Sequence, residues 1–226
     1  MILVYGHPRS GTTALGYFLG EMFTEPSNEV MLSIDNSELR KLVYNSDINS
    51  RIFFLKNNDY EVIKEVSYGF NLDDLKTYIR NDHIKHAICI IRNDIFACVL
   101  STLISYQIKK WHGDGDFIRN AEIGPLSVNH FKYEIEELKR VNHEILSLLS
   151  PKVKVVIYED LFSVSPNQKQ RWIDLANHCG LKFDENRWQT INQKRYNSIE
   201  TYEKVPNISE LRKAYMEYIY ANPSNI

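Results

Sequence analysis

Short apolar runs alternate along the chain with longer segments in which apolar residues recur every three or four positions. The short apolar runs predict strands at residues 2–5 and 86–91, and a further strand is expected at residues 153–158. The longer spacing is typical of helices that bury one face. Such helices are expected over residues 12–23, 35–44, 72–79, 94–110, 128–149, 169–179 and 208–220. Strand and helix therefore alternate along most of the chain.

Two more segments, residues 51–56 and 61–66, lie close together between the predicted helices. Both favour strands, and the turn-forming residues Asn57, Asn58 and Asp59 stand between them. A β-hairpin is the simplest connection for such a pair, so we expect one here.

This alternation predicts an α/β fold, in which a mostly parallel sheet is flanked by helices and ligands bind beyond the carboxyl ends of the strands. No repeat or linker divides the sequence, so we expect a single domain over residues 1–226. The 226 residues are 43% hydrophobic and 25% charged, as in ordinary globular domains. A chain of this size buries roughly 70% of its unfolded surface, so we expect it to fold without disulfides or metal.

The charge balance argues against nonspecific nucleic-acid binding, and the cysteine content favours a reducing compartment. Lys and Arg number 27 against 29 Asp and Glu, so the chain lacks the positive field that drives nonspecific nucleic-acid binding. The three cysteines, Cys89, Cys98 and Cys179, are few and odd in number, which is typical of buried, reduced thiols. No run approaches the ~20 apolar residues of a membrane span. A cytoplasmic protein without a membrane span is expected.

Residues 6–13 form the connection between the first predicted strand and the first predicted helix. Backbone N–H groups and the positive end of a helix favour anions at such a place. Gly6, Gly11 and Thr12 have the spacing of a P-loop, but Thr12 stands where the nucleotide-binding Lys would be. An ATP or GTP hydrolase is therefore disfavoured. Arg9 places a cation inside the loop instead, where its planar fork suits a phosphate or sulfate.

Three segments resemble sulfotransferases that use 3′-phosphoadenosine 5′-phosphosulfate (PAPS). His-Pro-Arg-Ser-Gly-Thr-Thr-Ala-Leu at 7–15 resembles their 5′-phosphosulfate loop, Pro-Lys/Arg-Ser-Gly-Thr/Ser-Thr. Residues 90–101 resemble their 3′-phosphate segment, an apolar strand with Arg92 at its end and Ser101 on the next helix. Residues 155–161 resemble a strand that ends in Tyr-Glu-Asp-Leu. The Pro that often follows Arg-Asn is absent and Ser101 lies one residue further on, a variant that resembles the bacterial trehalose-type enzymes.

The resemblance implies a P-loop NTPase-like sulfotransferase architecture with PAPS as cofactor. The cofactor-binding residues that it implies are Arg9, Ser10, Gly11, Thr12 and Thr13 for the 5′-phosphate, Arg92 and Ser101 for the 3′-phosphate, and Lys194 and Arg195 in a late basic segment. Arg9 is also expected to be catalytic, by following the charge that develops on the bridging oxygen. Sulfuryl transfer depends mainly on positioning and charge stabilisation. We expect no metal, and the sequence has no carboxylate or His cluster at metal-ligand spacing.

The resemblance also bears on the other two catalytic groups. In the family a strand Lys contacts the transferring sulfonate, and Lys64 matches it. In the phenol and steroid enzymes a His two residues later is the general base, but here that residue is Val66. Glu65 is a poor substitute because alternation along a strand places it opposite Lys64. Trehalose-type enzymes use a Glu after the first helix, so Glu29 is the expected base, with Glu25 in reserve.

The resemblance thus implies an enzyme that moves a sulfuryl group from PAPS to a hydroxyl of a small-molecule, carbohydrate or lipid acceptor. Two alternatives remain. A P-loop-type small-molecule kinase would need a Lys equivalent at Thr12 and an Asp to hold Mg²⁺, for which Asp94 is the candidate. A non-catalytic, nucleotide-binding relative would explain why the usual base His is missing.

Overall fold

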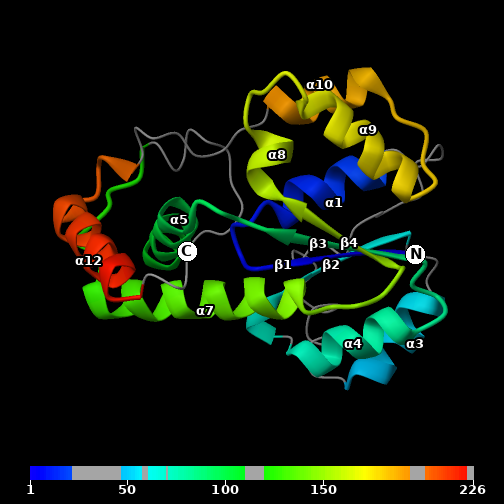
Figure 1. Ribbon diagram of the computed structural model, residues 1–226, viewed down its shortest axis with the longest axis horizontal. Coiled ribbons are helices and arrows are strands. Elements are labelled where there is room, and N and C mark those ends of the chain that lie inside the picture. Colours follow the sequence, from blue (N-terminus) through cyan, green and yellow to red (C-terminus); the bar gives the residue numbers. More distant parts are fainter. Residues whose placement is uncertain (22–46, 58–60, 70, 110–119, 194–201, 223–226) are drawn as a thin grey trace. The chain divides into compact units, whose positions relative to one another are not determined.

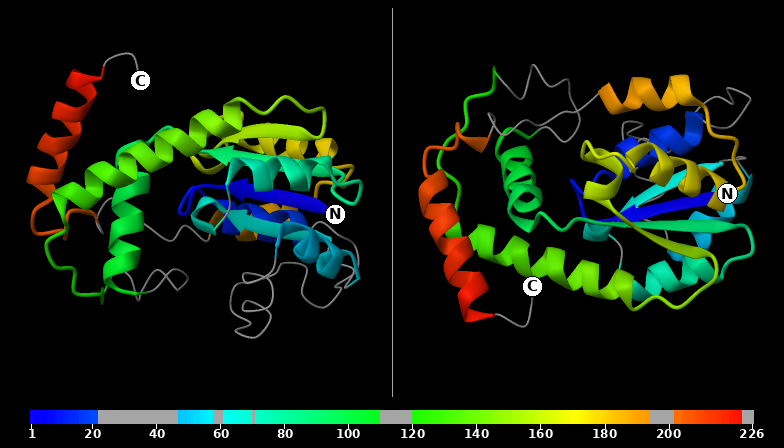
Figure 2. Two further views of the ribbon diagram at one scale, coloured as in Figure 1. Left: turned by 90° about the horizontal axis from the view of Figure 1, so that it is seen from below. Right: turned by 45° about the horizontal axis from the view of Figure 1, so that its top comes forward.

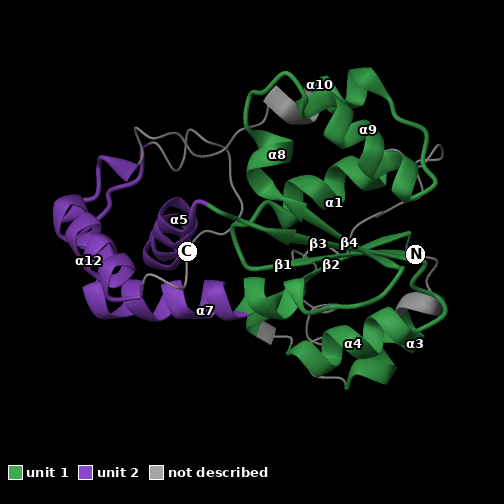
Figure 3. Cartoon of the chain, viewed as in Figure 1, with its two compact units in different colours: residues 1–93, 141–192 green, residues 94–140, 193–226 purple. Residues whose placement is uncertain are grey.

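The structure, a computed structural model, describes residues 1–21, 47–57, 61–69, 71–109, 120–193 and 202–222. The chain divides into two compact units, which Figure 3 colours separately. Unit 1 comprises Met1–Asn93 and Val141–Asn192, and unit 2 comprises Asp94–Arg140 and Gln193–Ile226. The single domain expected over residues 1–226 stays a prediction.

Unit 1 is built on a four-stranded sheet in the order β2-β1-β3-β4 (Figure 1). The strands are β1 (Ile2–Gly6), β2 (Val62–Val66), β3 (His86–Ile91) and β4 (Val153–Ile157). All three pairs of neighbouring strands are parallel. β1 and β3 lie in the middle of the sheet and are almost wholly buried, as their unbroken apolar runs predict. The predicted α/β class with a parallel sheet is confirmed.

Helices cover both faces of this sheet within unit 1, as the two views of Figure 2 show. One face packs against α1 (Thr12–Glu21), α8 (Tyr158–Phe162) and α9 (Gln168–His178), with Val4, Phe18 and Trp172 in the core. The other face packs against α3 (Ile48–Asn57), α4 (Leu72–Arg80) and the end of α7 (Val128–Leu146), with Leu3 and Leu75 in the core. A further helix, α10 (Glu185–Gln193), was not expected from the sequence pattern.

The hairpin expected at residues 51–66 is wrong. Residues 51–56 lie in α3, and β2 pairs in parallel with β1 instead of folding back on a neighbouring strand. Asp47 opens this helix, because its Oδ1 accepts hydrogen bonds from the backbone N–H groups of Asn49 at 2.9 Å and Ser50 at 3.1 Å. Parallel neighbours need a long crossover connection, so tertiary context outweighed the strand propensity of this apolar run. Phe53 is consequently 69% exposed.

Unit 2 contains α5 (Ile95–Gln107), the first part of α7 (Val128–Leu146) and α12 (Ile208–Ala221). These confirm the helices expected over 94–110, 128–149 and 208–220, with shorter ends. Their core includes Leu100, Phe131 and Leu211. The helix predicted over 35–44 lies outside the described residues. In the described parts of the chain, no helix is both long and apolar enough to cross a membrane.

Candidate anion-binding site

Glycine is favoured at both ends of the loop between β1 and α1, by close packing around Gly6 and by the backbone conformation of Gly11. A Cβ on Gly6 would lie 2.7 Å from both the carbonyl oxygen of Ile90 and the Oγ of Ser10. Arg9 and Gly11 have φ angles of 65° and 93°, in the left-handed region. The Ser10 hydroxyl and backbone N–H both donate to the carbonyl of His7, at 2.6 and 3.1 Å. The loop is therefore a tight, internally bonded turn.

The first turn of α1 provides hydrogen-bond donors beside this loop. The N–H of Leu15 donates to the carbonyl of Gly11 at 3.0 Å. The N–H groups of residues 12–14 lie on the N-terminal side of this hydrogen bond, in the first turn of the helix. The first turn contains no acidic residue. Helix N-termini of this kind attract phosphate and sulfate groups.

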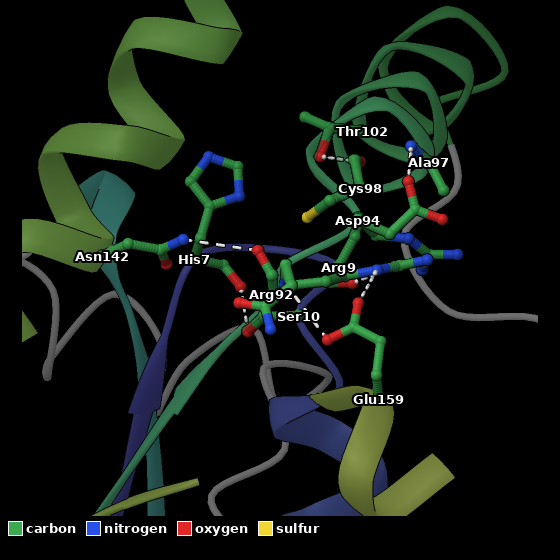
Figure 4. Close-up of polar contacts among 11 residues, drawn as sticks. His7, Arg9, Ser10, Arg92, Asp94, Ala97, Cys98, Thr102, Asn142 and Glu159 are labelled. Atoms are coloured by element: carbon green, nitrogen blue, oxygen red, sulfur yellow. Dashed lines mark hydrogen bonds and ion pairs between the residues drawn. The ribbon is translucent and has the colours of Figure 1, made fainter. Parts of the chain in front are cut away.

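The loop lies where strand order favours ligand binding. β1 and β3 are neighbours in the middle of the sheet. The chain continues from β1 to β2 at one edge, and from β3 to β4 at the opposite edge. The carboxyl ends of β1 and β3 therefore flank the switch point of the sheet, where open parallel sheets bind ligands. Arg9 follows the first of these ends and Arg92 the second. The Nη1 of Arg92 donates to the carbonyl oxygen of Arg9 at 2.9 Å, so the structure brings both residues together (Figure 4).

Arg92 is 9% exposed and has several partners in unit 1. Its guanidinium carbon lies 4.4 Å from the centre of the Tyr158 ring, and its Nε lies 3.9 Å from Oε1 of Glu159. The side-chain amide of Asn142 donates to the Arg92 carbonyl at 3.3 Å. Tyr158 and Glu159 belong to the motif at residues 155–161, from which no role was predicted for either side chain. No signal in the sequence pointed to Asn142.

Lys64 is the second predicted catalytic residue that the structure brings to the loop. It is on β2 opposite Val4 and is 6% exposed. Its Nζ donates to the Oγ1 of Thr13 at 3.1 Å, which puts a buried ammonium group at the start of α1. Lys64 is thus not an exposed strand charge, although its predicted contact with a sulfonate stays a prediction.

Glu65 contacts helices of the other face of the sheet, as strand alternation predicts. Its Oε1 accepts a hydrogen bond from the Tyr78 hydroxyl at 3.1 Å and lies 3.9 Å from Nη1 of Arg51. Burial raises the pKa of Glu65 to about 7, although Arg51, Tyr78 and Lys64 each act to lower it. Asp74 adds a smaller upward effect on the same pKa. The geometry therefore agrees with excluding Glu65 as a base beside Lys64.

The remaining predicted site residues lie outside the described residues or in unit 2. Four of the predicted site residues, Glu25, Glu29, Lys194 and Arg195, lie outside the described residues. Ser101 is buried on α5 of unit 2, whereas Arg92 belongs to unit 1, so their predicted convergence stays a prediction. Asp94 caps α5, because its Oδ1 accepts from the N–H of Ala97 at 2.9 Å. Among the described residues no three His, Cys, Asp or Glu side chains are grouped to hold a metal ion.

The fold and the loop together define an α/β protein with a glycine-containing, cationic turn at the switch point of a parallel sheet. No protein-family model matches the chain, and no curated protein matches it significantly. Among solved structures, the sulfotransferase domain from the curacin biosynthetic pathway is similar, with 15% sequence identity and a TM-score of 0.49. The similarity covers 89% of this chain and 81% of that chain. The fold class rests on the parallel pairing of the described strands themselves.

Proposed function

We propose that this chain is a sulfotransferase that moves a sulfuryl group from PAPS to a hydroxyl of a small-molecule, carbohydrate or lipid acceptor. The observation that carries the proposal is the turn after β1, where Arg9 stands inside a loop of P-loop spacing and Thr12 replaces the nucleotide-binding Lys. Lys64 supports it, because its buried ammonium group adds a second positive charge at the start of α1.

The residues present fit a phosphosulfate group. Gly6 allows backbone atoms to approach closely, and the first turn of α1 carries no acid that would repel an anion. PAPS, when bound, supplies the activated sulfonate. The residues proposed to hold its 5′-phosphate are Arg9, Ser10, Gly11, Thr12 and Thr13. Those proposed for its 3′-phosphate are Arg92, Ser101, Lys194 and Arg195.

Charge stabilisation is the main chemical task of the described residues. Arg9 is proposed to stabilise the negative charge that grows on the leaving oxygen as the sulfur–oxygen bond lengthens, and Lys64 is proposed to contact the transferring sulfonate. Glu29 is proposed to accept the proton of the acceptor hydroxyl, whose oxygen forms the new bond to sulfur. A carboxylate acts as such a base when its pKa lies near the working pH.

Thermal unfolding with three ligands tests the proposal. We expect 3′-phosphoadenosine 5′-phosphate to raise the melting temperature more than ADP or Mg-ATP does, because a ligand stabilises the folded state that binds it. A larger shift with Mg-ATP would favour the kinase. Sulfate transfer from labelled PAPS to a panel of sugars, phenols and lipids then tests turnover, with Glu29→Gln as the inactive control. Binding of the bisphosphate without transfer to any acceptor would favour a non-catalytic protein.

A further inference from the structure

Tyr158 and Glu159, the first two residues of α8, contact the segments that follow β1 and β3. The Tyr158 ring lies beside the guanidinium group of Arg92 at 4.4 Å. The same ring packs against the β1 loop, because a Cβ on Gly11 would be 2.7 Å from its Cδ2 atom. The residue that follows β4 is therefore in contact with both segments that flank the switch point.

The Glu159 carboxylate uses both of its oxygens on the segment after β3. Its Oε1 lies 3.9 Å from the Nε of Arg92, and its Oε2 accepts a hydrogen bond from the backbone N–H of Asn93 at 3.1 Å (Figure 4). Glu159 is thus within ion-pair distance of the Arg92 side chain and is hydrogen-bonded to the backbone of the next residue. Because Arg92 is only 9% exposed, the attraction across this ion pair favours a position of the Arg92 side chain beside α8.

Arg92 in turn contacts Arg9, the non-glycine residue of the β1 loop that has a positive φ angle. Arg9 has a φ of 65°, a conformation that non-glycine residues adopt rarely and at a cost. The Arg92 Nη1 donates a charge-assisted hydrogen bond to the carbonyl oxygen of this same residue at 2.9 Å. The hydrogen bond therefore stabilises the left-handed conformation of Arg9 in the loop between β1 and α1.

We propose that Glu159 is a positioning residue that holds the Arg92 guanidinium against the carbonyl of Arg9 and thereby maintains the conformation of loop residues 7–11. Its effect on ligand binding rests on the proposed function, whereas its effect on the loop does not. Glu159 touches no reacting atom in this proposal and acts only through Arg92.

Amide hydrogen exchange on the whole protein tests the effect on the loop without any ligand. The amide of Ser10 is informative because it donates to the carbonyl of His7. We expect Glu159→Gln to speed its exchange about tenfold, the loss expected when a charged partner is removed. Asp160→Asn, which removes the same charge from the next residue of α8, is the matched control and leaves exchange unchanged. Equal protection in Glu159→Gln and wild type would overturn the proposal.

Two further variants separate positioning from a general loss of structure. Glu159→Asp keeps the charge and is expected to restore part of the Ser10 protection, and it also serves if Glu159→Gln fails to fold. Arg92→Lys removes the fork and should speed exchange as Glu159→Gln does. The double variant should be no worse than either single one, because both changes break one connection. Fully additive effects would contradict this.

Binding of 3′-phosphoadenosine 5′-phosphate then tests the consequence for ligands. Glu159→Gln should weaken binding about tenfold while Asp160→Asn does not. Unchanged or tighter binding in Glu159→Gln would show that Glu159 does not prepare the site. If wild type binds no bisphosphate, the proposed function fails, and the exchange result still decides the role of Glu159 in the loop.

Discussion

The buried Glu65 carboxyl makes the stability of the protein depend on pH in a calculable way. It is 7% exposed, contacts Arg51 and Tyr78, and has a pKa that burial raises from 4.5 to about 7. The folded protein therefore binds this proton more tightly than the unfolded chain does. The resulting stabilisation is fully present below pH 4.5 and is lost as the pH rises through about 7.

The magnitude follows from the size of this shift. One pKa unit corresponds to about 1.4 kcal/mol, so a rise from 4.5 to about 7 is worth about 3 kcal/mol. Glu65→Gln removes this titration and leaves the other groups in place. As the pH rises from about 4.5 to about 8, wild type should lose about 3 kcal/mol of unfolding free energy that Glu65→Gln does not lose. The difference between variant and wild type should therefore change by this amount in favour of the variant.

Denaturant unfolding of both proteins at several pH values measures this difference. Asp73→Asn is the control, because it removes an exposed carboxylate from the first turn of α4, the helix that packs near Glu65. The reasoning is refuted if the difference between Glu65→Gln and wild type stays constant from pH 4.5 to pH 8. It is also refuted if wild type gains stability relative to the variant as pH rises.

Three further predictions concern the loop, the sheet lysine and the thiols. Gly6→Ala should lower the free energy of unfolding by about 1–3 kcal/mol because its Cβ meets the Ile90 carbonyl. Gly180→Ala, with φ 69° and open space around it, should cost only about 1 kcal/mol in the same denaturation assay. Lys64→Met should reduce kcat for the proposed sulfuryl transfer by about tenfold or more, and an unchanged kcat in steady-state assays would exclude its catalytic role. Burial raises the pKa of both Cys89 and Cys179 to about 12, so a thiol reagent should modify them at pH 8 only after unfolding. Rapid labelling of either of these two cysteines in the folded protein would contradict this.

Local sequence patterns predicted the strands and most helices of the sheet unit. Unbroken apolar runs gave β1 and β3 because these central strands are buried on both faces. The helix expected over 169–179 is α9, and Gly180, which has a φ of 69°, follows its end. The failure at α3 has a different origin, because the crossover between parallel strands depends on which strands pair and not on local propensity.

The site was predictable only where it depends on one segment. The turn at residues 6–13 was found from its glycines, its Arg and its place between strand and helix. The contacts of Arg92 with Arg9 and Glu159 join residues far apart in the chain, so spacing alone could not reveal them. Lys64 was identified by the resemblance, but its contact with Thr13 depends on the register of β2 against β1.

Calorimetric titration with 3′-phosphoadenosine 5′-phosphate tests the central claim most directly, which is that the Arg9 loop binds the carrier of the sulfonate. We expect wild type to bind and Arg9→Ala to bind about a hundredfold more weakly, since a charge-assisted fork to the 5′-phosphate is lost. Arg171→Ala, which removes an exposed arginine on α9, should bind as wild type does. No binding to wild type, or equal affinity in Arg9→Ala, would contradict the account.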